Sequence, residues 1–156
     1  IGHPMQPEYA ICAVPEHGQR VCNPREEASV DPNWLAEAEA SERAEARRRR
    51  SLYGRADAPS VAGKLAIIVD DGIATGLTMR AAIRDADARE PARVVVAIPV
   101  VPSSTAAMLE TEADELVALE ITDHYLGAVG AYYDSFPQVS DDAVIQMLEQ
   151  AAGREG

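Results

Sequence analysis

One stretch of the sequence constrains the fold more than any other, the segment Lys64–Arg80, which reads KLAIIVDDGIATGLTMR. It opens with a run of aliphatic residues, and such a run predicts a strand that is buried on both faces of a sheet. An acid pair, Asp70 and Asp71, follows directly, and a loop of small residues then leads into a predicted helix over 77–88. This order predicts a parallel α/β unit with a functional loop at the carboxyl end of its strand.

The loop has the chemistry of a site for a phosphorylated sugar. A helix N-terminus offers free N–H groups and the positive end of a dipole to a phosphate, and the hydroxyls of Thr75 and Thr78 add to it. Gly72 and Gly76 allow a tight turn. The two carboxylates can accept hydrogen bonds from vicinal hydroxyls or hold Mg²⁺ through water. An isolated acid pair is more often only a charged strand end, but the whole order of strand, acids, loop and helix favours a phosphosugar site.

The rest of the chain fits one α/β domain. Two further strands, over 93–101 and 114–120, extend the pattern into parallel crossovers and predict a small doubly wound parallel sheet. We expect a single domain divided into four regions: a hairpin region at 1–30, a charged helix at 31–54, an α/β core at 63–120, and a C-terminal hood-like segment with a last helix at 121–156.

The N-terminal region contains both cysteines of the chain. A strand over 8–14 and a short partner over 19–22, joined by a turn at 16–18, predict a hairpin that places Cys12 opposite Cys22. For a protein of the reducing cytoplasm, two buried reduced thiols are favoured over a disulfide. A zinc site would need more ligands than this region supplies.

A polar helix is predicted over 33–52, with the dipeptide at 31–32 supplying an Asp N-cap and a Pro in the first turn. The arginine run at 47–50 admits two interpretations, a phosphate-binding surface or a solvated, salt-bridged helix face, and the second is favoured. Two pairs at i,i+4 spacing support it: Glu39 with Arg43, and Glu45 with Arg49.

The charge of the chain limits its partners. The formal net charge is −12, so the chain should repel nucleic acid backbones and anionic membrane surfaces. No apolar run approaches the roughly 20 residues of a membrane span, and no signal-peptide pattern is present. A cytoplasmic protein that acts on small molecules is the expectation, and homo-oligomer formation stays open.

The stretch IIVDDGIATGLT at 67–78 resembles the PRPP-binding motif of type I phosphoribosyltransferases. The segments at 1–14, 69–84 and 128–142 resemble one branch of that family, the uncharacterised predicted phosphoribosyltransferases of bacteria and archaea. The resemblance therefore covers most of the chain.

The resemblance implies a reaction and a set of site residues. The reaction is the transfer of ribose 5-phosphate from PRPP to a nitrogenous acceptor, with release of pyrophosphate and with Mg²⁺ as cofactor. The acid pair, Asp70 and Asp71, would bind the ribose hydroxyls or the metal, directly or through water. The implied phosphate-binding residues are Gly72, Ile73, Ala74, Thr75, Gly76, Leu77 and Thr78, and the candidates for covering the acceptor base are Val129, Tyr132 and Tyr133.

Two departures from the family pattern keep alternatives open. The family carries its pyrophosphate loop in a first βα unit, and no such turn precedes the motif in this sequence, so a non-catalytic module that binds PRPP or a nucleotide is the second hypothesis. A partial domain that folds only as an oligomer, through an exposed sheet edge, is the third. Ala74 stands where purine-salvage members often have an Asp, so no purine acceptor is assigned.

Overall fold

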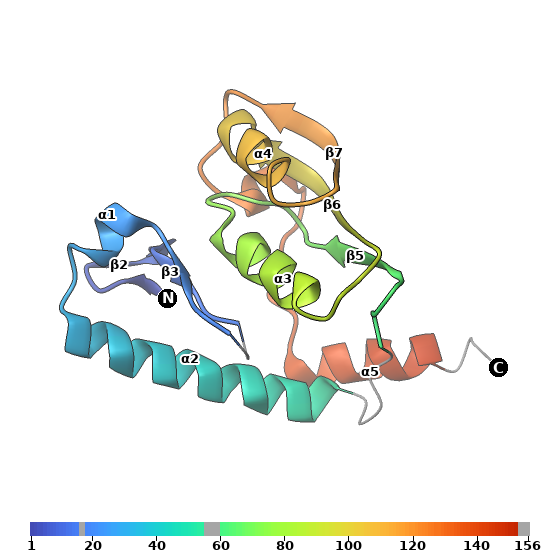
Figure 1. Cartoon of the computed structure of the whole chain (residues 1–156), viewed down its shortest axis with the longest axis horizontal. Coiled ribbons are helices and arrows are strands. Elements are labelled where there is room, and N and C mark those ends of the chain that lie inside the picture. Colours follow the sequence, from blue (N-terminus) through green and yellow to red (C-terminus); the bar gives the residue numbers. More distant parts are fainter. Residues whose placement is uncertain (16–17, 55–59, 153–156) are drawn as a thin grey trace.

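The computed structural model describes residues 1–15, 18–54 and 60–152 (Figure 1). Figure 1 shows the N-terminal strands and the long helix α2 beside the α/β sheet, with α5 near the end of α2. The elements in chain order are β1 (Gly2–His3), β2 (Gln6–Ala10), β3 (Cys12–Ala13), β4 (Val21–Cys22), α1 (Pro24–Glu27), α2 (Pro32–Tyr53), β5 (Leu65–Val69), α3 (Leu77–Asp87), β6 (Arg93–Pro102), α4 (Ser103–Leu109), β7 (Glu115–Thr122), the 3-10 helix η1 (Val129–Tyr132) and α5 (Asp141–Ala152).

The centre of the fold is a parallel sheet in the order β5-β6-β7. Helices α3 and α4 form the two crossovers, and the register pairs Val69 of β5 with Ala97 of β6. The predicted α/β class with a parallel sheet is confirmed. The register also brings the carboxyl ends of the strands to one edge, where Pro102 at the end of β6 pairs with Thr122 of β7.

The main hydrophobic core lies on one face of this sheet. Val94, Val96 and Ile98 of β6 pack there with Ile83 of α3 and Leu109 of α4, and each of these side chains is buried. Both helices lie on the same face because right-handed crossovers that step in one direction along a sheet place their helices on one side.

The opposite face of the sheet, which we call the open face, is apolar and largely uncovered. Its positions on the outer strands remain exposed: Leu65, Ile67 and Val69 of β5, and Val117, Leu119 and Ile121 of β7. Ile67 is 57% exposed and Leu119 is 88% exposed. The prediction that the strand at 65–69 is buried on both faces is therefore wrong for this structure, because α3 and α4 both pack on the other side.

The N-terminal strands form short antiparallel pairs, and β3 pairs with β4 so that Cys12 lies opposite Cys22. The two cysteines form a disulfide with a Cα–Cα distance of 4.0 Å, so the expectation of reduced thiols is wrong. Directly opposed residues in antiparallel strands approach closely enough for this bond. The predicted strand at 8–14 is divided, because Ile11 and Cys12 turn their N–H groups to the Ile1 carbonyl. The turn predicted at 16–18 lies partly outside the described residues.

Helix α2 begins as predicted. The Asp31 carboxylate accepts hydrogen bonds from the backbone N–H groups of Asn33 and Trp34, both at 2.9 Å. Only Leu35 of this helix is buried. The arginine run is engaged in surface ion pairs, with Arg48 and Arg49 both on Glu45, which confirms the salt-bridged interpretation for these two residues.

The far end of α2 is joined to the C-terminal helix. The Tyr53 hydroxyl donates to Asp141, the first residue of α5, and Arg48 forms an ion pair with the same carboxylate at 3.0 Å. Among the helices of the described residues, none has both the length and the apolar character needed to cross a membrane.

Candidate functional site

The acid pair lies at the carboxyl edge of the sheet. Asp70 and Asp71 follow β5 directly, and the neighbouring strand β6 ends at Pro102, where α4 begins. In open parallel sheets this edge is where ligands bind. The structure therefore brings the predicted acid pair and the start of α4 to the edge that the sequence indicated.

Strand β6 and helix α4 hold the backbone of the loop between the acid pair and α3. The Ile73 N–H donates to the Val100 carbonyl at 2.9 Å, and the hydroxyl of Thr105 donates to the Ala74 carbonyl at 3.0 Å. Thr105 is only 9% exposed, and the Ile73 side chain is buried in the main core. These contacts fix the loop backbone independently of any ligand.

Two glycines are required by close packing around the loop. Gly76 has a φ of +77°, and a Cβ there would lie 2.8 Å from Cγ2 of Thr105. A Cβ on Gly72 would lie 2.7 Å from Cγ1 of Val129, which belongs to η1. A side chain at either position would push the loop away from the elements that hold it.

The N-terminus of α3 has no side-chain cap from the residues that the structure describes. The helix begins after Gly76, which has no side chain to cap it, and its first intrahelical bond runs from the Arg80 N–H to the Gly76 carbonyl at 2.9 Å. The N–H groups before Arg80 thus lie in the uncapped first turn, which contains no acid. Thr75 and Thr78 are exposed beside them. The predicted phosphate-binding residues therefore divide into exposed ones and buried anchors, the latter including Ile73 and Leu77.

The two aspartates of the acid pair interact through the backbone. The Asp71 N–H donates to Oδ1 of Asp70 at 3.0 Å. Loss of water around the Asp70 carboxyl raises its pKa above the ordinary value of 3.8; the hydrogen bond from Asp71 opposes this shift, and the Asp71 charge adds to it. Burial therefore makes the Asp70 carboxyl harder to ionise than a fully hydrated aspartate.

The C-terminal aromatic segment reaches this loop. The Tyr133 hydroxyl donates to the Asp71 carbonyl at 2.6 Å, and Val129 covers Gly72. Two of the three predicted covering residues thus contact the acid-pair loop. The third, Tyr132, instead holds the segment together, because its hydroxyl accepts a hydrogen bond from the Leu126 N–H at 3.0 Å.

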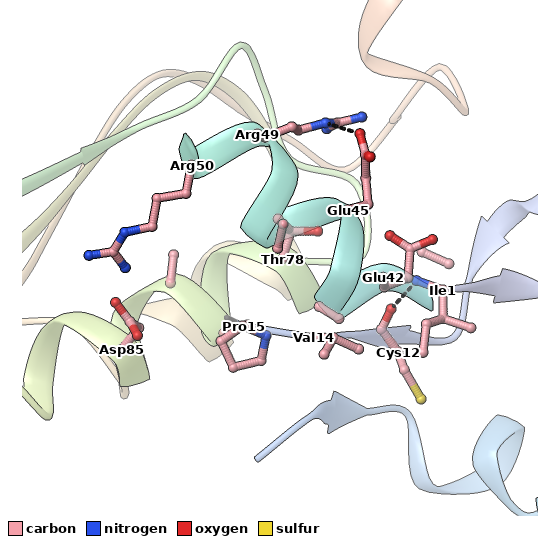
Figure 2. A pocket seen from close by; sticks show the side chains of 15 residues that line it. Ile1, Cys12, Val14, Pro15, Glu42, Glu45, Arg49, Arg50, Thr78 and Asp85 are labelled. Carbon is pink, nitrogen blue, oxygen red and sulfur yellow. Dashed lines mark hydrogen bonds and ion pairs between the residues drawn. The ribbon is translucent and has the colours of Figure 1, made fainter. Parts of the chain in front are cut away.

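A cavity of about 550 Å³ lies beside the site, between the N-terminal strands, α2 and α3 (Figure 2). Thr78 is the one residue of the predicted phosphate-binding set that lines it, and neither aspartate of the acid pair does. Figure 2 shows the ion pair of Arg49 with Glu45 at its wall. The cavity is therefore adjacent to the acid-pair site and separate from it.

Sequence reasoning missed Thr105 and Val100 as supports of the loop, and it named Tyr133 only as a candidate for covering the acceptor base. Thr105 and the Val100 carbonyl support the loop, and the Tyr133 hydroxyl ties it to the C-terminal segment. Thr105 comes three residues after Pro102, the end of β6, at the same sheet edge as the acid pair, and this position was a signal that could have indicated it. A hydrogen bond across 62 residues left no local signal.

Comparisons with known proteins show the family to which this chain belongs. The family model of the phosphoribosyl transferase domain matches residues 27–135. Proteins named "Putative phosphoribosyl transferase" from two strains of Mycobacterium tuberculosis, CDC 1551 / Oshkosh and H37Rv, are 38% identical over 154 residues, which cover 97% of this chain and 34% of theirs. The chain thus spans about a third of the length of these curated relatives.

A solved structure is similar as well. The crystal structure of TT1426 from Thermus thermophilus has a TM-score of 0.70 and 37% sequence identity, and the match covers 96% of this chain and 71% of that one. The order of strand, acid pair, loop and helix lies inside the region that the family model matches. This chain belongs to the phosphoribosyl transferase family.

Proposed function

We propose that the acid pair and the loop after it bind the ribose 5-phosphate part of PRPP, in a protein that transfers this group to a nitrogenous acceptor. The observation that carries the proposal is the uncapped N-terminus of α3, which stands directly beyond Asp70 and Asp71 on a backbone held by Val100 and Thr105. Such an arrangement offers N–H donors to a phosphate and carboxylates to sugar hydroxyls at the same time.

In this reaction the bond between C1 of the ribose and the pyrophosphate oxygen breaks, and pyrophosphate leaves with the electron pair. A bond forms between C1 and the acceptor nitrogen, which releases its proton to solvent. The contribution of the chain is positioning and charge. Asp70 and Asp71 accept hydrogen bonds from the ribose hydroxyls, and the backbone of 74–78 with the Thr75 and Thr78 hydroxyls holds the 5′-phosphate.

The acid pair also fits Mg²⁺ as a cofactor. A site at Asp70 and Asp71 would offer the ion two carboxylates. Among the described residues there is no group of three or more His, Cys, Asp or Glu that could hold a metal ion. Mg²⁺ commonly binds through one or two carboxylates, water and substrate phosphates, and it supplies positive charge that offsets the negative charge of the pyrophosphate.

We further propose that the C-terminal aromatic segment covers the acceptor base. Val129 and Tyr133 already lie against the acid-pair loop, and Tyr133 is 37% exposed, so its ring is available to a planar ligand. Tyr132 would support the cover through its own contacts within the segment.

The test is calorimetric titration with PRPP, with and without Mg²⁺, on the chain and on Asp71→Asn. We expect binding that this substitution weakens about tenfold or more, because a charge-assisted contact contributes about 1.5–3 kcal/mol. Asp87→Asn is the matched control, since Asp87 is exposed at the opposite end of α3 and its loss should leave binding unchanged.

The outcomes separate the hypotheses. Equal PRPP affinity of the chain and Asp71→Asn, or no PRPP binding to the folded chain, would contradict the proposed site. PRPP binding without pyrophosphate release, when the protein is given PRPP together with a panel of nitrogenous bases, would support the alternative of a non-catalytic PRPP- or nucleotide-binding module.

A further inference from the structure

The C-terminal aromatic segment, which contains Tyr133, covers the acid-pair loop and also forms a hydrogen bond with its backbone. Of its contacts with the loop, one is a directed hydrogen bond, from the Tyr133 hydroxyl to the Asp71 carbonyl at 2.6 Å. This bond acts on the backbone of an aspartate to which the proposed function assigns a ligand contact.

Both peptide groups that flank the Asp71 side chain are held. On the N-terminal side, its own N–H donates to Oδ1 of Asp70 at 3.0 Å. On the C-terminal side, its carbonyl accepts from Tyr133, and the next residue, Gly72, is packed under Val129. When the backbone on both sides is fixed, the direction of the Cα–Cβ bond is fixed too, and only side-chain rotation remains for the carboxylate.

The turn that presents Tyr133 is itself well ordered by contacts. The Tyr133 ring packs against Phe136 with centroids 5.0 Å apart, and its N–H donates to the Gly130 carbonyl at 3.3 Å. A Cβ on Gly130 would lie 3.0 Å from Cδ1 of Phe136, so the turn closes tightly on that ring. The hydroxyl is therefore delivered to the loop by a folded segment and not by a freely moving side chain.

We infer that Tyr133 is a positioning residue for Asp71, and that its hydroxyl sets the direction in which the Asp71 carboxylate meets the ribose hydroxyls of PRPP. The inference rests on the proposed function, and it differs from the base-covering role because it depends on the hydroxyl and not on the ring. Tyr133→Phe removes the hydroxyl alone and keeps the ring that packs on Phe136.

A tyrosine outside the proposed site is a matched control. The Tyr53 hydroxyl, at the end of α2, donates to the Asp141 carboxylate, and neither residue belongs to the loop after the acid pair or to the proposed base cover. Tyr53→Phe thus removes one tyrosine hydrogen bond and keeps the ring, without touching the residues proposed to bind PRPP.

The experiment compares PRPP affinity and thermal midpoint for the chain, Tyr133→Phe and Tyr53→Phe, at a temperature where all three are folded. We expect a decrease in the midpoint in both variants, because each loses a hydrogen bond. PRPP affinity should fall about three- to tenfold in Tyr133→Phe, the effect of losing one neutral hydrogen bond, and should stay within about twofold of the parent in Tyr53→Phe.

Two results would overturn the inference while the proposed function stands: unchanged PRPP affinity in Tyr133→Phe, or equal losses in both variants, each with Asp71→Asn still defective. If the folded parent does not bind PRPP at all, the proposed function fails and the role of Tyr133 fails with it.

Discussion

Replacing Gly76 by alanine tests whether the loop after the acid pair is as tightly built as the structure indicates. Gly76 has a φ of +77°, and an added Cβ would lie 2.8 Å from Cγ2 of Thr105 and 2.9 Å from Cε of Met108. Gly63 is the matched control, because it also has a positive φ, +67°, but a Cβ there would meet nothing within 4 Å.

The two variants share one energetic term and differ in another. Both must hold alanine in the left-handed region, at a cost of about 1–2 kcal/mol. Only Gly76→Ala adds overpacking against α4, about 1–3 kcal/mol more. The Met108 side chain can move, but Thr105 is buried and donates to the Ala74 carbonyl, so relief of the clash should disturb the loop.

The assay is urea unfolding followed by the fluorescence of Trp34, the single tryptophan, together with thermal melting. The excess cost in Gly76→Ala should appear as a midpoint lower than that of Gly63→Ala by about 2–4 °C per kcal/mol. PRPP affinity should fall in Gly76→Ala and not in Gly63→Ala. Equal stability of the two variants would refute the reasoning that the loop is packed against α4.

Two further predictions concern the disulfide and the acid pair. Reduction of Cys12–Cys22, with a sequence separation of 10, should lower stability by about 2–3 kcal/mol through restored chain entropy, and a melting temperature insensitive to dithiothreitol would contradict this. Burial raises the pKa of Asp70 above 3.8. At pH values between 3.8 and the raised pKa, the folded state binds more protons than the unfolded state. Ionisation of Asp70 therefore lowers the free energy of unfolding as pH rises through this window. Asp70→Asn should therefore gain stability relative to the parent toward neutral pH, and a pH-independent difference in urea midpoints would contradict the shift.

Local patterns in the sequence identified the elements that carry the candidate site. The aliphatic run, the acid pair and the following glycines are adjacent in the chain, so the strand, loop and helix around Asp71 could be read directly. The register of Cys12 with Cys22 also followed from the spacing of a short hairpin. The oxidation state of these two cysteines did not follow from the sequence, because it depends on redox conditions that the residue pattern does not encode.

Features that depend on distant segments could not be read in this way. An aliphatic run such as 65–69 shows that both faces of a strand are apolar, but not which face another element covers. The support of Ala74 by Thr105 spans 31 residues, and the bond from Tyr133 to Asp71 spans 62. Such contacts follow from how the crossovers and the C-terminal segment pack, and no periodicity reports them.

The position of β5 at the margin of the sheet has a consequence for motion. In the described part of the chain β5 pairs with β6 alone, whereas β6 is paired along both sides. Amide protons of β6 should therefore exchange with solvent most slowly, and those of β5 should exchange through local openings of lower free energy. The acid pair directly follows β5, which should open locally more easily than β6. A ligand that contacts both Asp71 and the first turn of α3 would disfavour these local openings. Binding of such a ligand should therefore slow amide exchange along β5.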